Sequence, residues 1–126
     1  MTAPGMRVEV TTAATAECRV RIAGEIDMAT IGALRTAFAE ILETWAPERL
    51  VVDLSCITFL SAAGVRVFVQ VDNRMRREGA GFAIDPVSPV ADRVLQACAC
   101  GELVGTALAA SPGVTPLRRA RRPPWS

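Results

Sequence analysis

A hydroxyl residue stands where an apolar, strand-like run meets a helix-like run, within positions 51–65. Ser61 follows the apolar pair Phe59-Leu60 and precedes the helical pattern, so its side-chain oxygen can accept a hydrogen bond from an amide of the first turn. Unpaired amides and the positive end of the helix dipole meet at such a junction, where they favour an anion or a phosphoryl group. We therefore expect helix capping at Ser61, and we expect the function to lie at this junction.

Residue types elsewhere in the chain argue against catalysis. The chain has no histidine, which removes the commonest general base and a major metal ligand. Asp27 is a lone carboxylate and supports no acid-base chemistry, and no glycine-rich phosphate loop is present. The four cysteines lack zinc-finger spacing. The sequence predicts a protein that is not an enzyme and that holds no cofactor and no metal.

Alternating and helical patterns predict the elements that position the junction. Two period-2 segments indicate a hairpin, and apolar residues at spacings of three and four indicate helices. The predicted order is strands at 6–12 and 17–23, a helix that Thr30 caps and Pro47 ends, and a strand at 50–54. A helix at 62–77, a strand at 82–85, a short helix at 88–98 and an edge strand at 102–104 complete it.

This order predicts an α/β (α+β) domain with a mixed sheet of about 4–5 strands and about 3–4 helices packed on it. The apolar run at 50–54 is typical of a central strand that is covered on both faces. Residues 1–110 should form one domain, and residues 111–126, rich in arginine and proline, should be disordered. Without its arginine-rich tail the chain is mildly acidic, so the folded body should bind no nucleic acid. No apolar segment is long enough to span a membrane, and we expect a soluble, cytoplasmic protein.

The predicted helix at 62–77 carries two apolar strips. One strip (Gly64, Val67, Phe68, Val71 and Met75) should face the core. A second strip, which includes Ala62, Val65 and Val69, has Arg66 and Arg77 at its margin. This second strip either docks a partner protein or packs under a neighbouring helix.

Several motifs together resemble the STAS domain of anti-sigma factor antagonists. They are Gly24-Glu-Ile-Asp27 before the first helix, Asp53-Leu-Ser55 on a strand, Phe59-Leu60, and Gly64-Val65 at the start of the second helix. The resemblance implies a STAS fold and a partner that is an anti-sigma factor of the GHKL kinase fold. By sequestering that partner, proteins of this family release a sigma factor, and the partner turns them off by phosphorylating a Ser or Thr in an Asp-Ser-Ser-Gly segment.

This chain departs from that segment. Ser61 stands at the family's Asp, and Ala62 and Ala63 occupy the two following positions, so no hydroxyl is present where the phosphoryl group is accepted. The familiar switch should therefore be absent. Ser61, Ser55 and Thr58 are the substitute acceptors to consider, although each is displaced from the expected position.

The resemblance and the second strip together define the expected partner-binding residues. They are Asp27, Met28, Ser61, Ala62, Ala63, Val65, Arg66 and Val69. A different role stays open, because similar single-domain STAS proteins serve as subunits of membrane lipid-transport ATPase complexes. The sequence favours neither a particular partner nor an oligomeric state.

Overall fold

The computed structural model describes residues 2–12 and 16–105, with only the backbone described at residues 2 and 3. Five strands form one sheet in the order β1-β2-β3-β4-β5. They are β1 (Thr2–Ala3), β2 (Met6–Thr12), β3 (Glu17–Ile26), β4 (Arg49–Leu60) and β5 (Gly81–Val87). The helices are α1 (Ile31–Trp45), α2 (Ala62–Arg77), α3 (Pro89–Ala97) and the short 3-10 helix η1 (Gly101–Leu103).

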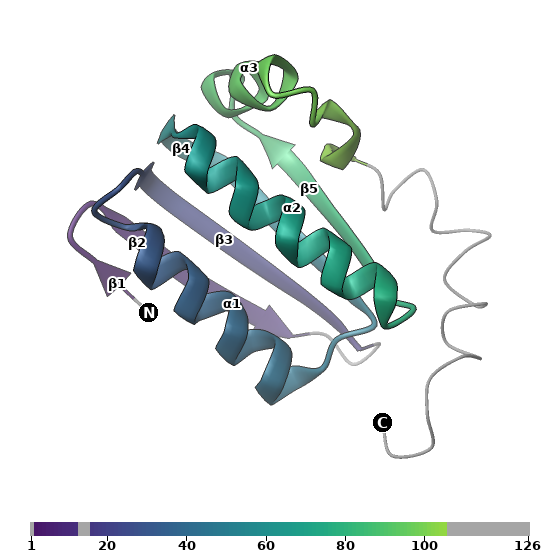
Figure 1. Ribbon diagram of the computed structural model, residues 1–126. Coiled ribbons are helices and arrows are strands. Elements are labelled where there is room, and N and C mark those ends of the chain that lie inside the picture. The colour runs from purple at the N-terminus through teal and green to yellow at the C-terminus, as the bar shows by residue number, and fades with distance from the viewer. Residues whose placement is uncertain (1, 13–15, 106–126) are drawn as a thin grey trace.

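The sheet is mixed, as the sequence predicts. β1, β2 and β3 pair antiparallel, whereas β3, β4 and β5 pair parallel. Because α1 and α2 connect the parallel strands, the carboxyl ends of β3, β4 and β5 lie at the same end of the sheet (Figure 1). The predicted fold class is confirmed.

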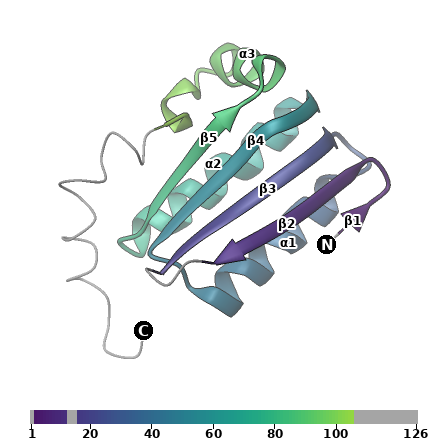
Figure 2. The ribbon, with the colours of Figure 1, turned by 180° about the vertical axis from the view of Figure 1, so that it is seen from behind.

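Both long helices lie on the same face of the sheet, and Figure 2 shows the opposite face without a helix over it. Among the described residues, α1 and α2 therefore cover one face of β4, whereas the sequence predicts cover on both faces. Leu50 and Val52 point to the helices and join the main core. Val51 points the other way and is also buried, flanked in register by Arg19 on β3 and Ala83 on β5.

The core lies between this sheet and the two helices. Its largest fully buried side chains come from the sheet and from α1 and α2, and they include Ile22, Leu34, Leu54 and Phe68. The rings of Phe38 on α1 and Phe68 on α2 meet edge to face, with 5.9 Å between centroids. Apolar burial of this kind contributes about 1.5–3 kcal/mol for each large side chain, and it fixes the two helices against the strands.

The predicted helix limits agree closely with the structure, but one predicted strand does not form. Residues 102–104 do not make an edge strand, because most of this segment belongs to η1. Val104 makes only a single parallel bridge with Ile84 of β5. Residues 111–126 lie outside the described part of the chain. None of the helices in the described ranges is long and apolar enough to cross a membrane.

Candidate functional site

Two strand-to-helix junctions meet at the carboxyl end of the parallel strands. Ile26 ends β3 and Leu60 ends β4, and the two residues pair in register. The amide of Ser61 donates a hydrogen bond of 2.9 Å to the carbonyl oxygen of Ile26. The loop that follows β3 and the first residue of the α2 junction are therefore joined through the backbone, and both are presented at the same end of the domain.

Ser61 caps α2, which confirms its predicted structural role. Its backbone is extended, and its Oγ accepts a hydrogen bond of 3.1 Å from the Gly64 amide. Gly64 is needed for close packing, because a Cβ on this residue would lie 2.5 Å from Cγ2 of Ile26 and 2.9 Å from Cδ1 of Leu60. The first turn of α2 thus lies directly against the ends of β3 and β4.

The loop between β3 and α1 is held by its own side chains. Asp27 Oδ1 accepts hydrogen bonds from the amides of Ala29, at 2.9 Å, and Thr30, at 3.2 Å. Thr30 occupies the position before α1, but its side chain makes no cap hydrogen bond to the helix. Thr30 is therefore the N-cap residue of α1, as predicted, but it does not cap the helix through its hydroxyl, and its own amide donates to Asp27 Oδ1.

Large apolar side chains are exposed around these junctions. Met28 is 79% exposed in the Asp27 loop, and Phe59 is 49% exposed near the end of β4. Phe59 pairs in register with Glu25 at the end of β3. Sequence reasoning used Phe59 only as a motif marker and missed its exposure. The available signal was its place immediately before Leu60, since adjacent strand residues point to opposite faces.

The start of α2 presents some of the expected binding residues and hides others. Ala62 and Arg66 are exposed, and Ala63 is partly exposed. Val65 is only 3% exposed, and Val69 is partly buried against the core. The expectation that Val65 belongs to an exposed strip is wrong, because its side chain packs among the buried side chains of the core. Val65 is a core residue.

Every candidate hydroxyl already has an internal partner. Ser61 Oγ accepts from the Gly64 amide. Ser55 is exposed and donates a hydrogen bond of 2.6 Å to Asp53 Oδ1. Thr58 is exposed and donates a hydrogen bond of 3.2 Å to the carbonyl oxygen of Gly24. These hydroxyls therefore serve the local structure of the junction.

Asp53 has a structural role on β4. Burial would raise the pKa of its carboxyl group, but hydrogen bonds from the Ser55 hydroxyl and amide and from Arg21 outweigh burial and hold the pKa below its ordinary value. The folded-state pKa is thus lower than that of the unfolded chain. Asp53 stabilises the fold at pH values above the unfolded pKa, and this contribution is lost as the pH falls through the folded value.

Replacing Asp53 with asparagine tests this role. We expect the free energy of unfolding at pH 7 to fall by about 1 kcal/mol, because a charged acceptor is replaced by a neutral one. The difference between variant and wild type should shrink as the pH falls below ~4, where the native carboxylate becomes protonated. Urea denaturation between pH 7 and pH 2.5 measures both curves. A difference that does not change with pH would contradict the role.

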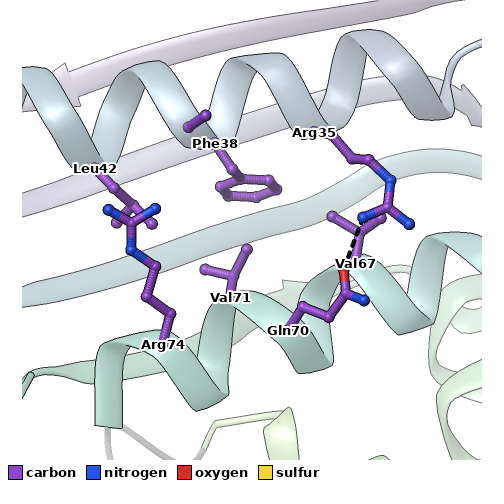
Figure 3. Close-up of a pocket in the computed structure, with 8 residues that line it drawn as sticks. Arg35, Phe38, Leu42, Val67, Gln70, Val71 and Arg74 are labelled. Atoms are coloured by element: carbon purple, nitrogen blue, oxygen red, sulfur yellow. Dashed lines mark hydrogen bonds between the residues drawn. The ribbon is translucent and has the colours of Figure 1, made fainter. Parts of the chain in front are cut away.

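An open groove of about 160 Å³ runs between α1 and α2 (Figure 3). Its lining residues are Arg35, Phe38, Ala39, Leu42, Val67, Gln70, Val71 and Arg74. The Nη1 of Arg35 donates a hydrogen bond of 2.7 Å to Gln70 Oε1, and the Arg74 guanidinium pairs with Glu78. The groove contains no nucleophile beside a base. Among the residues that the structure describes, no cluster of three or more His, Cys, Asp or Glu side chains could hold a metal ion.

The fold and this site define an α/β domain that presents exposed loop residues at one end of a mixed sheet. The model of the STAS domain family matches residues 7–111, and the chain belongs to this family. The resemblance drawn from the motifs is confirmed.

Solved structures with similar folds include anti-sigma factor antagonists. One, from Mycobacterium paratuberculosis, is 26% identical, with a TM-score of 0.73, and the match covers 90% of this chain and 98% of that one. The antagonist SpoIIAA in its unphosphorylated form is 14% identical, with a TM-score of 0.70, covering 86% and 98%. The phosphorylated Bacillus SpoIIAA is 15% identical, with a TM-score of 0.60, covering 78% and 88%. The two SpoIIAA structures share the fold with this chain.

Proposed function

We propose that this chain is a non-catalytic anti-sigma factor antagonist. It binds an anti-sigma factor of the GHKL kinase fold and so regulates transcription in the cytoplasm. The observation that carries the proposal is the joined pair of junctions, where the Asp27 loop and the start of α2 are linked by the Ser61–Ile26 hydrogen bond. The 26% identity to an antagonist, over nearly the whole of both chains, supports the same function.

The proposed docking surface comprises exposed residues of these junctions together with the partly exposed Asp27. Its apolar part is Met28, Phe59 and Ala62, and its polar part is Asp27 and Arg66. Ser61, Ala63 and Val69 are partly exposed and lie at its margin. Interfaces of this kind combine an apolar centre with a polar rim, and a few aromatic or arginine residues carry most of the binding free energy.

We further propose that the usual phosphorylation switch is absent. Ala62 and Ala63 offer no hydroxyl, and Ser61, Ser55 and Thr58 are engaged in hydrogen bonds within the fold. A phosphate on Ser55 would also lie beside the Asp53 carboxylate, where like charges repel. The antagonist would then remain able to bind its partner in the presence of ATP.

Purified protein mixed with a panel of anti-sigma factors and ATP tests the proposal. We expect a stable complex with at least one of them. A pull-down from native cells that instead recovers a membrane lipid-transport ATPase, with no anti-sigma factor binding, would overturn the sigma assignment in favour of the transport role.

Replacing Phe59 with alanine should weaken this complex about 10- to 100-fold, because aromatic side chains in an interface are common hot spots. The matched control is Trp45→Ala. Trp45 is 51% exposed, close to the exposure of Phe59, but it ends α1 and so lies at the opposite end of that helix from the Asp27 loop. Isothermal titration calorimetry measures both affinities. Equal losses of affinity in the two variants would show that Phe59 does not contribute to the interface more than an exposed aromatic residue elsewhere.

A further inference from the structure

Thr30 is a buried polar residue whose hydroxyl serves the Asp27 loop rather than the helix. It is 2% exposed. Its Oγ1 accepts a hydrogen bond of 2.9 Å from the Asp27 amide and donates one of 3.0 Å to the Glu25 carbonyl oxygen. We propose that Thr30 is a positioning residue that holds Asp27 and Met28 in the form that a partner recognises. This inference rests on the proposed function.

Thr30 connects the end of β3, the Asp27 loop and the start of α1, through its hydroxyl and its main-chain carbonyl. Glu25 belongs to β3, and its own amide donates to the Gly5 carbonyl oxygen at 2.8 Å, so the strand end is fixed on the other side. The carbonyl oxygen of Thr30 accepts the Leu34 amide at 3.0 Å, which begins the hydrogen bonding of α1. Thr30 therefore joins the end of the sheet to the start of the helix and closes the loop between them.

The loop conformation determines which oxygen of the Asp27 carboxylate is available to a partner. Oδ1 is occupied by the amides of Ala29 and Thr30. Within the described residues, no hydrogen bond is made by Oδ2, and Asp27 is partly exposed. A partner that fits would present a guanidinium, an ammonium or a backbone N–H group to Oδ2. Next to this donor it would need an apolar recess for Met28.

Replacing Thr30 with valine keeps the shape of the side chain but removes the hydroxyl. The Asp27 amide and the Glu25 carbonyl oxygen then lose their partner, and the loop relaxes. We expect the affinity for the anti-sigma factor to fall about tenfold or more, as follows when a buried hydrogen bond that fixes a binding group is lost. Thr30→Ser retains the hydroxyl and should restore most of the affinity. Thr36→Val, on the exposed side of α1, is the matched control and should bind like the wild type.

A double-mutant cycle with Asp27→Ala separates positioning from general stability. If Thr30 acts through Asp27, Thr30→Val should cause little further loss in the Asp27→Ala background. Additive losses would overturn the inference. Hydrogen exchange provides a readout without a partner: the Asp27 and Ala29 amides should exchange about tenfold faster in Thr30→Val, as expected for local opening. The Phe68 amide should not change.

These readouts distinguish the two proposals. A wild type that binds no anti-sigma factor overturns the proposed function and the partner-binding half of the inference. Unchanged exchange at Asp27 and Ala29 overturns the positioning itself, whether or not a partner binds. Wild-type binding together with unchanged affinity in Thr30→Val overturns the inference alone.

Discussion

Replacing Gly24 with alanine should lower the free energy of unfolding by about 3 kcal/mol or more. Gly24 has a φ of +101°, a conformation that is strained for any residue with a side chain. A Cβ on Gly24 would also overlap the carbonyl oxygen of Gly5. Since that oxygen accepts the Glu25 amide, the backbone cannot move aside without losing the hydrogen bond that fixes the end of β3.

Urea denaturation followed by circular dichroism measures this loss. Gly32→Ala is the matched control, because a Cβ on Gly32 would have no atom within 4 Å and the residue lies within α1. Alanine has a higher helix propensity than glycine, so the control should be more stable than the wild type by about 0.5–1 kcal/mol. A Gly24→Ala protein with wild-type stability would mean that the antiparallel part of the sheet is not packed as described.

Local signals account for most of the fold that could be predicted. The α2 helix begins and ends where the sequence places it, because Ser61 caps its first turn and Gly79, with a φ of +77°, follows its end. The hairpin of β2 and β3 follows from the alternation of apolar and polar residues, which leaves one face of each strand exposed to solvent. These features depend on interactions between residues that are only a few positions apart, so a local sequence pattern is enough to predict them.

The features that were missed depend on residues far apart in the chain. Whether Val65 faces solvent is decided by how α2 packs onto the core, whose members come from elements far apart in the sequence. The exposure of Phe59 arises because β4 continues beyond its pairing with β5, whose last paired residue is Val87, opposite Leu54. A helical wheel does not contain the first fact. Strand alternation indicates only that Phe59 points away from Leu60, not that β4 no longer pairs with β5 there. That the site lies at the junction therefore stays a prediction. The sequence could not indicate which of its proposed members are exposed.

The proposed loss of the phosphorylation switch rests on two alanines. Ala62 is exposed at the first position of α2, and Ala63 follows it, partly exposed. Either Ala62→Ser or Ala63→Ser would place a hydroxyl where the family accepts its phosphoryl group. A phosphate here would lie at the positive end of the helix dipole, so the fold should tolerate it.

We expect one of these two variants to become phosphorylated when it is mixed with ATP and a kinase-type anti-sigma factor that binds the wild type. The wild type itself should stay unmodified. Phosphorylation should then weaken the complex at least tenfold, because about −1.5 to −2 charges are added to an apolar docking surface. Ala39→Ser, on the exposed part of α1, is the control and should stay unmodified.

Intact-mass spectrometry and phosphopeptide mapping measure these outcomes. A wild type that is phosphorylated on Ser55, Thr58 or Ser61 would show that the two alanines do not remove the switch. Variants that bind the kinase but remain unmodified would show that a hydroxyl alone is insufficient. In that case Ser61, which stands where the family has aspartate, would be the next residue to change, because each variant still lacks an acidic side chain beside the acceptor.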